Sequence, residues 1–511
     1  MTRSDDSLDL SLIPLPAEVE AQPGHLDLRG GLTLSTLGLA DEAAGSAGDI
    51  HALIDLLAGW LADAGVDLRR DTALNGDGAA GLTLSLTAED TGPEAYRLSV
   101  SPSQIELAAA DRAGLFYAAQ TLRQLIDSAQ RGRLRCVTIR DAPRFAWRGF
   151  MLDSARHCQP VSWIKQHLDR LASLKMNRLH WHLSDDHAWR AEIKRYPRLT
   201  EAASWPGAGQ TKGFYTQQEM REVVQYAADR HIQVIPEIDT PAHCNAALVA
   251  YPELSCGGQP LPIDEDAGWE AFTARAGRRA YCAGKPQTYE FLQGVWTELA
   301  EIFDPQYLHV GGDETPEKAW QDCPHCGELR QRLGADNAGL RLHFMNRLAD
   351  FCHQQLRLST IGWTEGVSDQ IPEGQIVQAW FPHEAAQAAR LGYDVINSNH
   401  EWTYADYPAN EEDRKHRPDW MLVLPLEKVY HFEPTPDGLE EAHRQRILGS
   451  EMSLWTESLP DAASLEKQIM PRLLAFAEVV WTPRLRRGYD SFRSRLNQYQ
   501  SAPDLPRAVA V

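Results

Sequence analysis

Two adjacent carboxylates, Asp313 and Glu314, follow an apolar stretch and two glycines in the sequence HVGGDE. An apolar stretch with a β-branched valine is typical of a buried strand. Gly311 and Gly312 permit a sharp bend or the close approach of another group. A lone Asp-Glu pair is most often a solvated strand end or a helix cap. Proton donors in hydrolytic sites occupy the same kind of position, so the rest of the chain decides between these interpretations.

From Arg148 onward, strand-like and helix-like stretches alternate, which is typical of an α/β protein with a parallel sheet. Helical patterns such as residues 161–175, 216–231 and 340–356 separate the strand candidates. Their number favours a (β/α)8 TIM barrel over a doubly wound open sheet, for which the chain lacks a GxGxxG fingerprint. The strand candidates are residues 148–155, 177–185, 232–239, 307–314, 357–365, 375–381, 393–401 and 446–455.

The first part of the chain has a different pattern. Residues 81–87 and 95–109 alternate apolar and polar side chains, as half-buried strands do, and residues 113–130 read as an amphipathic helix. We therefore expect a small α+β domain over residues 1–143. The barrel, with a C-terminal helical region, is expected over residues 144–511.

Acids and aromatic residues gather where the strand candidates end. A barrel forms its active site at the C-terminal ends of its strands. Core packing alone would not place these residue types there repeatedly, so a functional interpretation of the Asp313–Glu314 pair is favoured. The residues at or just past the strand ends are Asp153, Arg156, His180, His182, Asp185, Asp186, Glu237, Asp239, His243, Asp313, Glu314, Trp363, Glu365, Trp380, Trp402, Tyr404, Asp406, Trp455 and Glu457.

This combination of residue types suits a neutral, hydroxyl-rich ligand, because sugar faces stack on tryptophan while acids and arginine bind hydroxyls. Glycoside hydrolysis usually needs two carboxylates that flank the bond, about 5 Å apart for retention of configuration. Asp313 and Glu314 are neighbours, and on an extended segment they would point to opposite faces. Substrate-assisted hydrolysis instead needs one acid and one orienting carboxylate, because the sugar's own 2-acetamido oxygen is the nucleophile.

At these residues the chain resembles a glycoside hydrolase family 20 β-N-acetylhexosaminidase. The resemblance runs from about Arg148 to the C-terminal region, and the N-terminal segment resembles the family's small α+β companion domain more weakly. It implies exo-cleavage of terminal non-reducing β-linked GlcNAc or GalNAc, with retention and an oxazolinium intermediate. The matching stretches are RGFMLDSARH, KMNRLHWHLSDDHAWR, IPEIDTPAH, HVGGDE, IGWTE, QAWF, YADY and SEMSLWTE.

The resemblance implies three catalytic roles. Glu314 would be the general acid/base, which protonates the leaving oxygen and then activates water. Asp313 would hold the acetamido N–H and stabilise the oxazolinium charge. Tyr404 would donate a hydrogen bond to the acetamido oxygen. An acid that works near neutral pH needs a raised pKa, which low polarity and nearby negative charge supply.

The resemblance also implies the binding residues. The walls of the acetamido pocket would be Trp363, Trp380 and Trp455. The residues that bind hydroxyls of the terminal sugar would be Arg156, Asp406 and Glu457. A supporting pair near the acid would be Asp185 and His243.

One position departs from the family pattern. The stretch IPEIDTPAH has Ala242 where the family usually has glycine. If this residue needs a positive φ, alanine would cost stability and shift His243, whose role is then in doubt.

Two other classes of function fit parts of the sequence. His180-Trp181-His182 at a strand end invites a metal-dependent barrel hydrolase, with His243 and Asp185 as further ligands. That hypothesis leaves the aromatic residues unexplained, and we expect His180 and His182 to be hydrogen-bonded histidines of the barrel wall. A non-catalytic carbohydrate-binding barrel is the third class, against which the acid beside an acetamido clamp argues. Glu237 and Asp239 are interpreted as structural acids, and His157 and Glu365 are left undecided.

The eight cysteines are too few for a disulfide scaffold in a chain of 511 residues. Cys323-Pro-His-Cys326 has CxxC spacing, but no second CxxC accompanies it, so we interpret it as structural or incidental. No metal and no cofactor are expected. Cys256 and Cys282 bracket a long irregular stretch and could form a disulfide under oxidising conditions.

The formal net charge of -21 argues against nucleic acids and anionic membranes as partners. The expected partner is an oligosaccharide or glycoconjugate that contains N-acetylhexosamine. The N-terminal residues lack the apolar core of a signal peptide, so a cytoplasmic protein is expected, or a periplasmic or secreted one if a leader has been removed. Oligomeric state and the preference between GlcNAc and GalNAc stay open.

Overall fold

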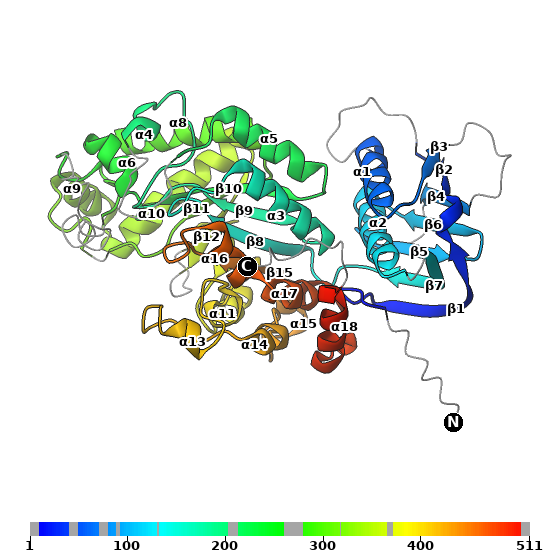
Figure 1. Ribbon diagram of the computed structural model, residues 1–511. Coiled ribbons are helices and arrows are strands. Elements are labelled where there is room, and N and C mark those ends of the chain that lie inside the picture. Colours follow the sequence, from blue (N-terminus) through cyan, green and yellow to red (C-terminus); the bar gives the residue numbers. More distant parts are fainter. Residues whose placement is uncertain are drawn as a thin grey trace.

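The computed structural model describes residues 10–39, 50–70, 80–87, 92–129, 132–202, 213–259, 279–316, 318–364 and 371–501. It contains a smaller N-terminal domain on a mixed sheet and a larger closed barrel, which lie side by side (Figure 1). The chain passes from one sheet to the other between Asp141, at the end of β7, and Trp147, at the start of β8. The predicted fold class is confirmed.

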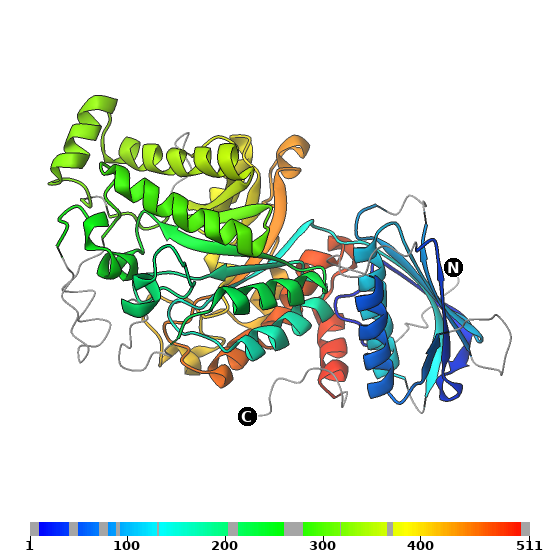
Figure 2. The same cartoon turned by 90° about the horizontal axis from the view of Figure 1, so that it is seen from above.

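The N-terminal sheet has the order β1-β7-β5-β6-β4-β2-β3. Two helices, α1 (Ile50–Asp63) and α2 (Arg112–Asp127), cover the face of this sheet that is turned toward the barrel (Figure 2). The predicted helix over residues 113–130 is α2, whose first turn is capped by Asp111. The strands are β1 (Glu18–Asp27), β2 (Leu32–Leu37), β3 (Leu68–Arg70), β4 (Ala80–Leu86), β5 (Tyr96–Val100), β6 (Gln104–Ala109) and β7 (Arg133–Asp141).

The barrel is closed in the order β10-β11-β12-β13-β14-β15-β8-β9, and every neighbouring pair is parallel. Each strand candidate of the sequence overlaps one of these strands. They are β8 (Trp147–Asp153), β9 (Arg178–His182), β10 (Gln233–Thr240), β11 (Tyr307–Gly311), β12 (Ser359–Thr364), β13 (Ile376–Ala379), β14 (Val395–Asn397) and β15 (Ile447–Leu454).

Helices surround the barrel and fill the connections between its strands (Figure 1). No helix in the described parts of the chain is apolar over a length that would cross a membrane. The longer helices are α3 (Val161–Ser173), α5 (Gln217–Ala228), α8 (Pro286–Phe303), α9 (Pro324–Leu333), α10 (Asn337–Phe351), α16 (Ala462–Ile469), α17 (Arg472–Trp481) and α18 (Tyr489–Ser501). The shorter ones are α4 (Arg198–Ala202), α6 (Asn245–Ala250), α11 (Glu384–Arg390), α12 (His400–Thr403), α13 (Glu411–Arg414), α14 (Leu426–His431) and α15 (Glu441–Arg444).

Along β10 the interior of the barrel changes from apolar to charged residues. The inward-facing residues of this strand are two apart, as the strand period requires. Ile235 belongs to an apolar cluster with Trp147 and Ile361. Glu237 lies one step further among buried histidines, and Asp239 reaches the cavity at the strand ends. The inward-facing residues of β10 therefore run from an apolar cluster at the N-terminal end of the strand to a polar site at its C-terminal end.

The disulfide that Cys256 and Cys282 could form is not present in this structure, in which all cysteines lie in described parts of the chain and are free thiols. Cys326 lies close to both of these residues, and the sulfur atoms form a group rather than a pair.

Candidate active site

A cavity of about 520 Å³ opens at the C-terminal ends of the barrel strands. This volume lies in the range that suits a small ligand. Every residue that the sequence predicted for the site lines it: Arg156, Asp185, His243, Asp313, Glu314, Trp363, Trp380, Tyr404, Asp406, Trp455 and Glu457. The further lining residues are Asp239, Phe381, His400, Tyr407, Pro418, Trp420, Met421 and Ser458.

The backbone after β11 explains the two glycines that precede the acids. Gly311 and Gly312 have φ values of 69° and 121°, and Glu314 has φ 44°, so the chain leaves the extended conformation here. A Cβ on Gly311 would lie 1.7 Å from Asp239 Oδ1. Our premise of an extended segment with Asp313 and Glu314 on opposite faces is therefore wrong, because the turn directs both acids to the same cavity.

His243 links the acids to the next strand end. Its Nδ1 lies 3.3 Å from Asp185 Oδ1, and its Nε2 lies 3.5 Å from Glu314 Oε2 and 3.9 Å from Asp313 Oδ2. Burial opposes a charge on the ring, but Asp185 outweighs it and raises the pKa of His243 well above its ordinary value. A protonated imidazole therefore stands between Asp185 and the two acids.

Alanine at position 242, where the family usually has glycine, does not strain the backbone. The positive φ of this turn, 48°, falls on His243, while Ala242 is not among the described residues with positive φ. Ala242 is buried and adopts a conformation that alanine accepts. The condition for a displacement of His243 is therefore not met, and its ring lies against Asp185.

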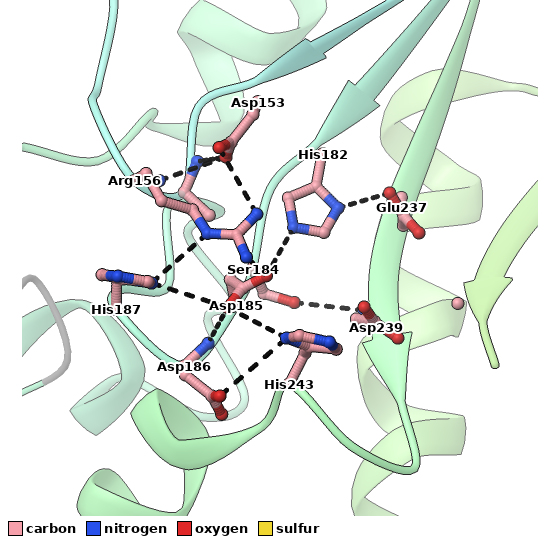
Figure 3. Close-up of polar contacts among 12 residues, drawn as sticks. Asp153, Arg156, His182, Ser184, Asp185, Asp186, His187, Glu237, Asp239 and His243 are labelled. Carbon is pink, nitrogen blue, oxygen red and sulfur yellow. Dashed lines mark hydrogen bonds and ion pairs between the residues drawn. The ribbon is translucent and has the colours of Figure 1, made fainter. Parts of the chain in front are cut away.

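Arg156 is the centre of a buried ionic network (Figure 3). Its Nη2 lies 2.9 Å from Asp185 Oδ2 and 3.4 Å from Glu457 Oε1, and its Nη1 lies 3.4 Å from Asp153 Oδ2. Asp153 also accepts hydrogen bonds from the backbone N–H groups of Arg156 and Thr456. Burial opposes the charge, but Asp185, followed by Glu457, raises the pKa of Arg156 well above its ordinary value.

Aromatic rings form one wall of the cavity. Trp363 donates a hydrogen bond from Nε1 to Glu237 Oε1 at 2.8 Å, which fixes the plane of its ring. The ring centroid of Trp455 lies 6.0 Å from that of Trp363 and 6.3 Å from that of Tyr404. The guanidinium carbon of Arg156 stands 5.0 Å over Trp455. Burial raises the pKa of Tyr404 well above its ordinary value, so its hydroxyl stays a hydrogen-bond donor.

Asp406 has an unsatisfied oxygen in the cavity. Its Oδ1 is buried without a hydrogen-bond partner among the described residues, as is Nε1 of Trp380. Burial, followed by the charge of Glu457, raises the pKa of Asp406 to about 8. A buried acceptor without a protein partner is costly, so this oxygen is suited to a ligand hydroxyl.

The histidines of the barrel wall lie beneath the cavity, as predicted. His180 has Nδ1 2.8 Å from Glu451 Oε1 and Nε2 3.0 Å from Glu237 Oε2. His182 has Nε2 3.0 Å from Asp185 Oδ2, and its Nδ1 contacts Glu237. Both nitrogens of each ring already face a carboxylate, which makes these side chains part of a salt-bridge network. Figure 3 shows His182 between Glu237 and Asp185.

Some lining residues escaped the sequence analysis. Asp239 was interpreted as a structural acid, which is wrong, because it lines the cavity; its place in the IPEID strand end was the available signal. Residues 418–421 belong to a long connection and give no strand-end signal. Trp402 stacks on Phe432 instead of facing the cavity. His157 is not among the described lining residues, and Glu365 lies outside the described residues.

A parallel (β/α)8 barrel whose strand ends bring acids and tryptophans into one cavity defines the class: a barrel glycosidase. The family follows from the sequence. The family model described as "Glycosyl hydrolase family 20, catalytic domain" matches residues 145–484, and the one described as "Glycosyl hydrolase family 20, domain 2" matches residues 9–142. The chain therefore belongs to glycosyl hydrolase family 20.

Curated relatives agree with this assignment. A beta-hexosaminidase of Akkermansia muciniphila is 35% identical over 85% of this chain and 88% of its own length. One of Vibrio furnissii is 33% identical over 92% of this chain and 76% of its own length. One of Porphyromonas gingivalis is 34% identical over 96% of this chain, which spans 62% of that relative's length.

Solved structures show the same likeness. An exo beta-N-acetylglucosaminidase from Vibrio harveyi, in complex with N-acetylglucosamine, superposes with a TM-score of 0.83 at 30% identity, over 96% of this chain and 77% of that one. The Streptomyces plicatus N-acetyl-beta-hexosaminidase in complex with Thio-NAglucal gives a TM-score of 0.79 at 33% identity, over 95% and 93% of the two chains.

Proposed function

We propose that this protein is an exo-acting β-N-acetylhexosaminidase, which removes terminal non-reducing β-linked GlcNAc or GalNAc with retention of configuration. The carrying observation is that the turn after β11 places both Asp313 and Glu314 in one cavity walled by Trp363, Trp455 and Tyr404. Only one acid is needed for proton transfer when the substrate supplies the nucleophile, and the second is free to orient it.

In the first step Glu314 gives its proton to the glycosidic oxygen. Asp313 accepts a hydrogen bond from the acetamido N–H, while Tyr404 donates one to the acetamido oxygen and aims it at the anomeric carbon. The acetamido oxygen bonds to this carbon as the glycosidic bond breaks, which gives an oxazolinium ion. In the second step Glu314 takes a proton from water, whose oxygen attacks the same carbon and releases the sugar.

The environment of Glu314 supports this cycle. Nε2 of His243 lies 3.5 Å from Oε2 of Glu314, close enough to orient this carboxyl while it gives up and takes back the proton. Asp185 holds the ring in place from the other side. Trp363 cannot rotate without losing its bond to Glu237, so the acetamido wall is preorganised, which lowers the cost of cyclisation.

The other end of the cavity is suited to the sugar hydroxyls. Arg156 offers N–H donors, while Asp406 and Glu457 offer acceptors, so each hydroxyl meets a matched group. Trp420 is 67% exposed and lines the same cavity, so we place the next sugar of the glycan against it. The substrate class is therefore an oligosaccharide or glycoconjugate that ends in N-acetylhexosamine.

The first test compares 4-nitrophenyl 2-acetamido-2-deoxy-β-glucoside with the matched β-glucoside that lacks the acetamide, both in EDTA. Cleavage of the acetamido sugar alone, with a β-configured first product by proton NMR, supports the proposal. Equal cleavage of both would require a nucleophile from the protein. Loss of activity in EDTA that metal restores, in protein whose unfolding temperature EDTA leaves unchanged, would favour the metal hydrolase, and binding without turnover would favour a carbohydrate-binding protein.

A further inference from the structure

Four cysteines from three separate chain segments meet beside the barrel. Cys256 follows the 3-10 helix Pro252–Leu254, and Cys282 precedes α8. Cys323 is the N-cap of α9, and Cys326 lies in its first turn. Cys282, Cys323 and Cys326 are buried, and Cys256 is partly buried.

The sulfur atoms have the spacing of a metal site. Sγ of Cys282 lies 3.6 Å from that of Cys326 and 3.7 Å from that of Cys323, and Sγ of Cys256 lies 3.9 Å from that of Cys326. All four ligand atoms lie within 4.8 Å of one another. A tetrahedral zinc ion with Zn–S bonds of about 2.3 Å separates its sulfurs by about 3.8 Å. A disulfide needs a sulfur separation of about 2.05 Å.

We propose that Cys256, Cys282, Cys323 and Cys326 bind one zinc ion as a tetrathiolate. Four thiolates around a tetrahedral centre are the ligand set of structural zinc, which leaves no open position for substrate. None of these cysteines is among the described residues that line the active-site cavity. The site is thus separate from the proposed reaction.

The backbone around the sulfurs is fitted to this task. A Cβ on Gly284 would lie 2.3 Å from the carbonyl carbon and oxygen of His325 and 2.6 Å from the nitrogen of Cys326, so only glycine allows these segments to approach.

The N-terminal end of α9, with Pro324 at its first position, brings partial positive charge to Cys323 and Cys326, which favours the thiolate form of these ligands.

The zinc ion would join the two loops that carry the catalytic acid and its histidine. Ser255, next to Cys256, forms a bridge with Tyr281, next to Cys282, and the N–H of Tyr281 donates to Pro241 O at 2.9 Å, two residues before His243. Trp320, in the loop that follows Glu314, donates from Nε1 to Tyr281 O at 2.9 Å. We assign the ion a structural role in holding these loops together.

The test begins with the full-length protein, purified in a reductant and without a metal-affinity step. Inductively coupled plasma mass spectrometry should find about one zinc per chain, as a closed tetrathiolate site requires. Cys282→Ser and Cys326→Ser should lose most of it and unfold at a lower temperature. Cys136→Ser is the matched control, because this buried cysteine lies in β7 of the other domain and should leave the zinc content unchanged.

A second measurement does not depend on the folding of variants. Wild-type protein stripped of metal and reloaded with cobalt should show the thiolate charge-transfer and d–d absorption of tetrahedral cobalt. Reduced protein that binds neither zinc nor cobalt would overturn the proposal, as would bound tetrathiolate iron or a native disulfide among these cysteines by peptide mass spectrometry. Metal content is measured without substrate, so this proposal and the hexosaminidase proposal can fail separately.

Discussion

Replacement of Glu314 should lower kcat by different factors for substrates with good and with poor leaving groups. Glu314→Gln keeps the shape of the side chain but removes the proton that a poor leaving group needs. We expect kcat for a natural N-acetylhexosaminide to fall by about 10²- to 10⁴-fold, with a smaller loss for a 2,4-dinitrophenyl leaving group that needs little protonation. Steady-state kinetics on both substrates measure this.

The control for this variant is Glu427→Gln, which alters an exposed carboxylate in α14 and should leave both rates unchanged. An equal loss on good and poor leaving groups would contradict the assignment of Glu314 as the acid.

Asp313 is tested by binding rather than by rate. Asp313→Asn removes the charge that faces the oxazolinium ion, so a thiazoline inhibitor that mimics this intermediate should bind more weakly. A charge-assisted hydrogen bond is worth about 1.5–3 kcal/mol, which predicts a loss of about 10- to 150-fold in Kd. Isothermal titration calorimetry measures it, and unchanged affinity would refute the orienting role.

The raised pKa of Asp406 predicts that this side chain lowers the stability of the protein as the pH rises, although it serves substrate binding. Its pKa is about 8 in the folded protein and 3.8 as a free side chain, so the folded state retains a proton that the unfolded state loses between these values. This carboxyl therefore makes the protein less stable as pH rises from about 4 to 8. Asp406→Asn lacks this penalty and should raise Tm relative to wild type more at pH 8.5 than at pH 5.

The same variant should bind the sugar more weakly, because an amide nitrogen replaces one of the two carboxyl oxygens and can no longer accept a hydrogen bond from a sugar hydroxyl. Thermal unfolding at the two pH values and the KM of the acetamido substrate measure both effects. A Tm difference that is the same at both pH values would mean that Asp406 titrates normally.

At the end of strand β11, the backbone conformation and the close packing leave room only for glycine at position 311. A methyl group there would meet Asp239 Oδ1 at 1.7 Å, and φ is positive as well. Gly311→Ala should therefore displace Asp239 or the turn that carries Asp313 and Glu314, and lower kcat/KM strongly. The variant should also have a lower free energy of unfolding than the wild type. Circular dichroism and hydrolysis rates separate the two effects.

Gly59→Ala is the matched control, since nothing lies within 4 Å of a Cβ at Gly59 in α1. Alanine in a helix is favoured over glycine by about 0.5–1 kcal/mol, so this variant should be slightly more stable and equally active. A fully active Gly311→Ala would show that the turn adapts.

The strands of the barrel and the residues at their C-terminal ends were predictable because both signals are local. A buried parallel strand is an apolar run, and its end is marked by the change to acids and aromatics. Glu237 and Asp239 mark the limit of this reasoning. Both are acids on the same face of β10, two residues apart. Only their depth in the barrel distinguishes Glu237, which pairs with buried histidines, from Asp239, which lines the cavity.

Other features depend on contacts that sequence spacing does not encode. The turn that directs Asp313 and Glu314 to one side requires the φ values of three residues, which the extended-strand rule does not supply. The cysteine group joins Cys256 and Cys282 to a CxxC stretch through the packing of three segments. A group of four cysteines does not need a second CxxC, because tertiary structure brings Cys256 and Cys282 to the first one.

For the whole molecule, Asp141 is the link between the two domains. Its Oδ2 accepts from Tyr96 OH of the first domain at 2.7 Å and from Trp481 Nε1 of the barrel at 2.9 Å, and it pairs with Lys175 Nζ at 3.1 Å. Both members of this ion pair are buried. Buried pairs tolerate joint replacement far better than the loss of one partner, which costs about 3–5 kcal/mol.

This geometry predicts that the two domains unfold together. Differential scanning calorimetry of the wild type should show one transition, because separating the domains would expose Asp141 and Lys175 without their partners. Lys175→Met and Asp141→Asn should each lower Tm, and the double variant should lose less stability than the sum of the two. Two well-separated transitions in the wild type, or strictly additive losses, would show that this contact does not couple the domains. A single transition would assign a stabilising role to the companion domain, which contributes no described residue to the cavity, because its removal would take Asp141 away from Lys175.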